Sequence, residues 1–99
     1  MKEIEVKTKT DIFNLVWQGK KLSELRLDDD KDYCVGDVLI QKEWGPKVGY
    51  KGRRVTARIS AITRLGHWVP DVDHRWVIVH LDPATVHRDR YPVKEGEWL

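Results

Sequence analysis

Val55-Thr56-Ala57-Arg58-Ile59-Ser60-Ala61-Ile62-Thr63-Arg64 is the clearest strand in the sequence, and it decides the fold class. Small or apolar residues recur at every second position, which is the period of side chains along a β-strand. We therefore predict that Arg58 and Arg64 face away from the core. The residues predicted to face inward are Val55, Ala57, Ile59, Ala61 and Thr63.

The flanking segments also favour strands. Residues 3–7 alternate between charged and apolar side chains, and residues 22–27 indicate a short extended segment. Residues 38–40 predict another strand, separated from the one at Val55 by a loop from Gly45 to Gly52 in a wide hairpin. Residues 76–81 form an apolar run that predicts a strand buried on both faces and ended by Asp82-Pro83.

A short helix is predicted between the first two strands. Thr10 or Asp11 is a candidate N-cap, and Gly19 supplies the stop after about two turns. One apolar stripe is expected to face the core; its members are Ile12, Phe13, Leu15 and Val16.

Together these elements predict an α+β fold, a small β-barrel of five to six mostly antiparallel strands with the early helix capping one opening. Ninety-nine residues are enough for one domain. We expect the domain to span residues 1–83, and residues 84–99 to form a polar tail that docks on the domain or extends from it.

Composition narrows the function classes. The net charge of +2 is too small to establish a nucleic-acid partner by itself. The single cysteine, Cys34, and an N-terminus without a signal-peptide pattern predict a cytoplasmic protein. No apolar run is long enough to span a bilayer, so no membrane partner is expected. The histidines and carboxylates match no zinc spacing, and no phosphate-binding glycine loop occurs, so no metal or other cofactor is expected.

The segment Gly19-Lys20-Lys21-Leu22-Ser23-Glu24-Leu25-Arg26 concentrates charge directly after the predicted helix. This helix, the segment with Lys21, Glu24 and Arg26, and the following Val35-Gly36-Asp37 resemble the G-x-K-x-x-E-x-R and V-G-D signatures of ASCH domains, members of the PUA-like superfamily. The sequences Gln41-Lys42-Glu43-Trp44 and Tyr50-Lys51-Gly52-Arg53 are similar to an uncharacterised ASCH-like family common in phages and bacteria. The resemblance covers about residues 6 to 82.

The resemblance implies a PUA-like barrel that binds a nucleic acid, RNA rather than DNA, or a modified nucleobase. Glu24 can accept hydrogen bonds from an exocyclic amine, and Lys21, Arg26 and Arg53 can hold a phosphate or a carbonyl. Stacking on an aromatic ring would contribute about 1 to 3 kcal/mol per base. The candidate rings are Trp44, Tyr50 and Trp68.

Three alternatives remain open. Similar small proteins remove the acetyl group from N4-acetylcytidine, which would make Lys21 and Glu24 catalytic, although Glu24 stands where those amidohydrolases carry their threonine nucleophile. A carboxylate next to Lys21 also favours the protonated lysine over the free base. The second alternative is a protein-interaction module of phage type, in which Trp98 and Leu99 would contact a partner. The third is a surface ion-pair cluster with no ligand.

Overall fold

The computed structural model describes residues 1–29 and 31–93. Within these residues the chain forms six strands, one α-helix and two short 3-10 helices. In chain order they are β1 (Glu3–Lys9), α1 (Thr10–Trp17), β2 (Ser23–Leu27), β3 (Val38–Gly45), β4 (Gly49–Arg64), η1 (Leu65–His67), β5 (Trp76–Leu81), η2 (Pro83–Thr85) and β6 (His87–Arg90).

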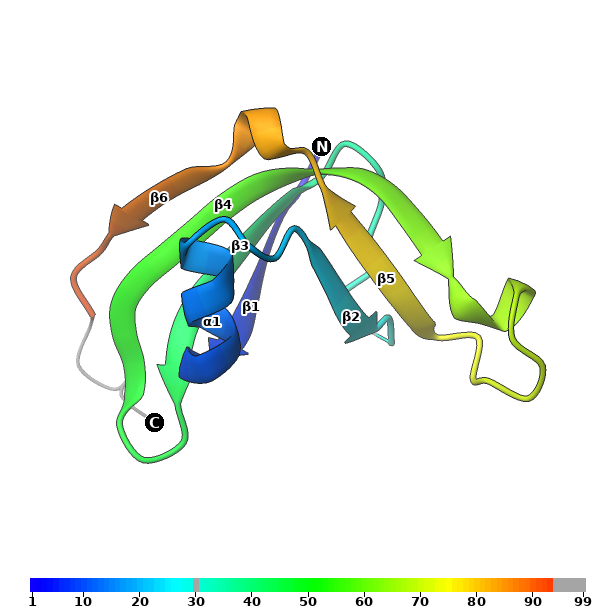
Figure 1. The fold of residues 1–99 in the computed structure, drawn as a ribbon, viewed down its shortest axis with the longest axis horizontal. Helices are drawn as coiled ribbons and strands as arrows, with labels where there is room; N and C mark the ends of the chain where they lie inside the picture. The colour runs from blue at the N-terminus through cyan, green and yellow to red at the C-terminus, as the bar shows by residue number, and fades with distance from the viewer. Residues whose placement is uncertain (30, 94–99) are drawn as a thin grey trace.

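The described strands form one curved sheet in the order β1-β3-β4-β5-β2, with β6 paired to β4. The β1–β3 pair is parallel and the other pairs are antiparallel, so the predicted α+β class with mostly antiparallel strands is confirmed. The predicted closed barrel is wrong, because β1 and β2 end the strand order and do not pair with each other. Figure 1 shows β4 arching over the molecule, with α1, β1 and β2 beneath it.

The arch follows from the length and irregularity of β4. Its first half pairs with β3 and β6 and its second half with β5, and the pairing register shifts between Ile59 and Ala61. A shift of one residue reverses which side chains face inward. Ala61 is therefore exposed, and Ile62 packs against the core instead, which corrects the inward positions predicted for Ala61 and Thr63. Arg58 is exposed and faces away from the core, as predicted. Arg64 is exposed at the end of β4 but lies on the strand face of Ile62, opposite the buried Val77, so its predicted outward direction is wrong.

The β3–β4 hairpin is tight, and the predicted loop over residues 45–52 is wrong. Gly45 pairs with Gly49, so only three residues form the turn, and β4 continues through Gly52. Gly49 and Gly52 have φ angles of 72° and 93°, a region that glycine occupies without strain. These glycines therefore shape the hairpin rather than interrupt it.

β5 is buried on one face only, so the prediction that residues 76–81 are buried on both faces is wrong. Val77 and Val79 are fully buried, whereas Trp76 is 38% exposed on the opposite face. No second layer covers this outer face in the described part of the chain, so the apolar run over residues 76–81 did not indicate two-sided burial.

α1 packs beneath the arch through a stripe narrower than predicted. Phe13 and Val16 are buried against Val55 of β4, whereas Ile12 and Leu15 are exposed. Lys9 occupies the N-cap position and provides no side-chain cap, and Thr10 is already helical. The predicted cap by Thr10 or Asp11 is therefore wrong, although the helix itself is confirmed.

The larger core lies where β1, β3, β4 and β5 meet, around Leu39, Ile59 and Val79. Part of the predicted C-terminal tail adds to this fold, because residues 87–90 form β6 on the edge of β4. Trp98 and Leu99 lie outside the described residues.

Candidate functional site: a charged cleft between two strands

β2 and the turn before it bring three of the predicted site residues together. Glu24 and Arg26 share one face of β2, since alternate residues of a strand point the same way. Lys21 Nζ lies 3.2 Å from Glu24 Oε1, and Arg26 Nη2 lies 3.8 Å from Glu24 Oε2. The Glu24 side chain is only 6% exposed. A nearly buried carboxylate is thus held between two cations.

Arg26 extends this cluster across the gap to β1. Its Nη1 donates a hydrogen bond to the backbone oxygen of Lys7, at 3.2 Å, and its Nη2 donates to Thr8 Oγ1, at 3.1 Å. Thr8 in turn contacts Gln41 of β3, with 3.3 Å between Thr8 Oγ1 and Gln41 Oε1. The cluster therefore draws its polar groups from three strands.

Thr8 and Gln41 are site residues that the sequence interpretation missed. Both are buried, at 3% and 1% exposure. Thr8 follows Ile4 and Val6 in the alternating series of inward-facing residues on β1. A polar residue at such a buried position needs a hydrogen-bond partner, and this pattern could have identified Thr8 from the sequence. Neither residue belongs to the charged segment of residues 19–26 from which Lys21, Glu24 and Arg26 were predicted.

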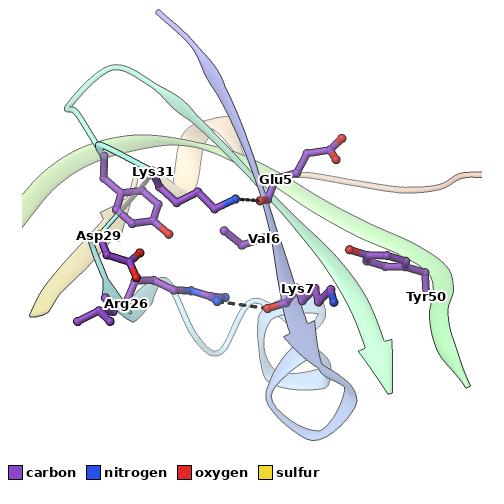
Figure 2. A pocket seen from close by; sticks show the side chains of 9 residues that line it. Glu5, Val6, Lys7, Arg26, Asp29, Lys31 and Tyr50 are labelled. Carbon is purple, nitrogen blue, oxygen red and sulfur yellow. Dashed lines mark hydrogen bonds between the residues drawn. The ribbon is translucent and has the colours of Figure 1, made fainter. Parts of the chain in front are cut away.

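Two hollows adjoin the cluster at the free edge of β1. The inner hollow, of about 300 Å³, is lined by Lys7, Thr8, Lys9, Ile12, Glu24, Leu25 and Arg26. The outer hollow, of about 390 Å³, is lined by Glu5, Val6, Lys7, Arg26, Leu27, Asp29, Lys31, Tyr33 and Tyr50. Figure 2 shows Arg26 and Asp29 on one side of β1 and Tyr50 on the other. Small-molecule sites commonly enclose about 300 to 1,000 Å³, so each hollow could hold one small ring system.

The cluster offers strong hydrogen-bonding groups and one nearby hydroxyl. Glu24 Oε1 and Arg26 Nε are buried and make no hydrogen bond with described residues, although Glu24 Oε1 is ion-paired with Lys21. Lys21 Nζ also donates to the backbone oxygen of Ser23. Ser23 and Glu24 are neighbours on β2, so their side chains point to opposite faces of the strand. The hydroxyl that contacts the cluster is that of Thr8, whose Oγ1 accepts a hydrogen bond from Arg26.

Arg53, another predicted site residue, is engaged in a different cluster. Its guanidinium binds both carboxylate oxygens of Glu43, at 2.8 and 3.0 Å, and donates to Asn14 Oδ1 at 2.7 Å. The guanidinium carbon also lies 5.1 and 5.0 Å from the ring centres of Phe13 and Trp17. Hydrogen bonding from Arg53 lowers the pKa of the Glu43 carboxyl, and the carboxylate raises the pKa of Arg53. This fork fixes α1 to the hairpin.

The three predicted stacking residues occupy different places. Tyr50 lines the outer hollow, with Lys42 Nζ 4.8 Å from its ring centre. Trp44 lies next to it in the β3–β4 pairing and has Lys7 Nζ 4.9 Å from its ring centre. Trp68, which follows η1, is 77% exposed. Trp68 lines neither of the two hollows, and Figure 1 shows the turn after β4 at the far end of the molecule from α1.

Two other site types find no support among residues 1–29 and 31–93. No group of three or more His, Cys, Asp or Glu side chains is arranged to hold a metal ion. None of the described helices has the length and apolar character needed to cross a membrane.

The fold and the cleft define a small α+β domain in which a buried carboxylate and its two cations lie between β1 and β2, two strands that do not pair with each other. Residues 4–81 match the family described as a domain of unknown function, DUF3850, so the chain belongs to this family. The chain is also similar to a curated relative, the "Uncharacterized 12.9 kDa protein in GpA 3'region" of Escherichia phage P2. The two are 42% identical over 76 residues, which cover 77% of this chain and 64% of the relative. The chain thus spans slightly less than two thirds of that protein.

Proposed function

We propose that this domain binds a nucleobase, in a nucleic acid or a modified nucleoside, in the cleft between β1 and β2. The observation that carries the proposal is the Glu24 carboxylate, nearly buried between Lys21 and Arg26 on the wall of the inner hollow. Burying a charge is costly unless it is paired, and a retained buried charge lining a cavity favours a role in recognition.

The chemistry of the cleft suits a polar, planar ligand. Glu24 would accept a hydrogen bond from an exocyclic amine, and Arg26 or Lys21 would donate to a ring carbonyl. Thr8 adds a hydroxyl oxygen that can accept a hydrogen bond, because its proton is donated to Gln41. Ile12 and Leu25 line the same hollow and would contact the flat face of the ring.

The resemblance to ASCH domains adds to the proposal. It places Lys21, Glu24 and Arg26 in the signature segment, and these are the three residues that meet at the cleft. A PUA-like classification is accordingly part of the proposal, as are an RNA rather than a DNA partner and a cytoplasmic location. Hydrolysis of N4-acetylcytidine and a protein-interaction role are kept as outcomes of the test.

The test is a proton NMR titration with the four ribonucleosides and N4-acetylcytidine, following the backbone amides, the indole N–H signals and free acetate. We expect saturable shifts at Glu24, Arg26 and Thr8 without acetate release. Acetate release that disappears in Lys21→Ala would identify an amidohydrolase. Absence of saturable shifts with any of the five nucleosides would overturn the proposal and favour a protein partner.

Two variants assign the binding to the cleft. Glu24→Gln removes the charged acceptor and should weaken nucleoside binding about tenfold or more, the effect of losing one charge-assisted hydrogen bond. The matched control is Glu3→Gln, which makes the same change at an exposed position of β1. If Glu24→Gln does not fold, Lys21→Ala replaces it. Equal affinity in the control and in both cleft variants would exclude this site.

A further inference from the structure

We infer that the ligand is one nucleotide of a single-stranded nucleic acid, and that the strand continues over the edge of β1 to a second subsite at Tyr50. This inference rests on the proposed function and specifies its ligand as a polymer of at least two nucleotides. It is carried by the position of the two hollows relative to β1.

The two hollows lie next to each other. Both are lined by Lys7 and Arg26, so they adjoin where Arg26 reaches β1. The inner hollow contains Glu24, and the outer hollow ends at Tyr50. Figure 2 shows that Arg26 and Tyr50 lie on opposite sides of β1, with Lys7 between them. A ligand that fills both hollows must therefore cross this strand.

The free edge of β1 allows such a crossing. β1 pairs only with β3 in the described sheet, and its other edge contacts side chains instead of a strand. Arg26 donates to the Lys7 carbonyl oxygen, and Lys31 Nζ donates to that of Glu5, at 3.4 Å. These two cations and the Lys7 ammonium line the crossing point. A phosphodiester between two nucleosides is the part of the ligand that would lie there, and it has the complementary charge.

Tyr50 suits the second base. Lys42 lies 4.8 Å from the Tyr50 ring centre and 4.7 Å from that of Tyr91, an arrangement that fixes the Tyr50 ring. The Tyr50 ring lines the outer hollow and is partly exposed there. An oriented aromatic ring at the end of a cationic path is the usual stacking platform for single-stranded nucleic acid, because every base has a π-face.

Two carboxylates oppose a phosphate in the outer hollow. Glu5 and Asp29 line it together with the cations, and Lys42 Nζ lies 3.7 Å from Glu5 Oε2. Removing the exposed Glu5 charge should therefore strengthen binding of a phosphodiester and leave binding of an uncharged nucleoside unchanged. This opposite response separates a phosphate contact from a general loss of structure.

The experiment compares the tightest-binding ribonucleoside with its dinucleoside monophosphate, in the ribose and deoxyribose forms, by calorimetry at two salt concentrations. We expect the dinucleoside monophosphate to bind about tenfold tighter than the nucleoside, consistent with one stacked base. This gain should fall as salt rises, whereas nucleoside affinity should not change. The two sugar forms distinguish RNA from DNA.

Variants then locate the gain. Tyr50→Ala and Lys31→Ala, which change residues that line only the outer hollow, should each remove most of it without weakening nucleoside binding. Tyr50→Phe should retain it, and Glu5→Gln should increase it. Lys47→Ala, which removes an exposed lysine in the β3–β4 turn, is the charge-matched control. If the nucleoside binds and the dinucleoside monophosphate binds no tighter, the second subsite is wrong and the nucleobase site stands. If neither binds, the proposed function fails as well.

Discussion

The Arg26 guanidinium donates a hydrogen bond to the Lys7 backbone oxygen and thereby links β2 to β1, two strands that share no backbone pairing. The same guanidinium contacts Thr8 and lies near Glu24. One side chain thus joins the two ends of the sheet and lines both hollows. Stability and recognition are coupled at this residue.

Arg26→Ala should lower the free energy of unfolding by about 1 to 3 kcal/mol, because it removes two hydrogen bonds from a charged donor and one of the cations beside Glu24. Urea denaturation measures the change. Arg58→Ala removes an exposed arginine of β4 and should change stability by less than about 0.5 kcal/mol. Equal effects in the two variants would contradict a bridging role for Arg26.

Arg53→Lys should destabilise the fold by about 2 kcal/mol, because lysine cannot reproduce the two-oxygen contact with Glu43 or the stacking against Trp17. Nucleoside affinity should be unchanged in the folded variant. Thermal unfolding and the titration described above test both parts. A selective loss of affinity would instead place Arg53 in the binding site.

Glu43→Gln should make stability less sensitive to acid. The Arg53 guanidinium lowers the pKa of the folded-state carboxyl below its ordinary value of 4.5. The stabilisation that the ionised Glu43 carboxylate gives the folded state is therefore complete above the pKa of Glu43 in the unfolded chain. It is lost as the pH falls through the lower pKa of Glu43 in the folded state. Unfolding free energies measured from neutral pH to about pH 3 should fall more steeply in the unmodified protein than in Glu43→Gln. Parallel pH profiles would contradict this linkage.

Gly19→Ala should cost about 1 to 2 kcal/mol, because Gly19 has a φ of 76° at the end of α1. An added Cβ would also lie 3.1 Å from Arg88 Nη2. The Arg88 guanidinium is held there because its Nε donates a hydrogen bond to the Trp17 carbonyl oxygen. Gly36→Ala has a similar backbone cost without any atom within 4 Å of the new Cβ. A larger loss of stability at Gly19 than at Gly36 would measure the Arg88 contact, and equal losses would show that the contact adjusts freely.

Trp68→Ala should leave nucleoside and dinucleoside affinity unchanged and alter stability by less than about 0.5 kcal/mol, because this ring is 77% exposed and lies outside the cleft. The variant also assigns one indole N–H signal for the titration. A clear loss of affinity would show that the ligand reaches the turn after β4.

The local elements were predictable from short-range pattern, but their burial was predictable only in part. Alternation located β1 and the strand at Val55, and Gly19 marked the end of α1. The bulge after Ile59 and the uncovered face at Trp76 depend on how the sheet curves and on which layers pack against it. Neither property is encoded in the spacing of residues within one strand.

The candidate site was likewise predictable only in part. The dense charges at Lys21, Glu24 and Arg26 identified a cluster that the fold does assemble. The sequence by itself determined these residue types and the common strand face of Glu24 and Arg26, because alternate residues of an extended segment point the same way. Only the tertiary structure decided that Thr8 and Gln41 join the cluster, that Arg53 binds Glu43 instead, and that β1 and β2 do not pair with each other. These contacts join residues distant in sequence, and their geometry is set by sheet curvature and core packing.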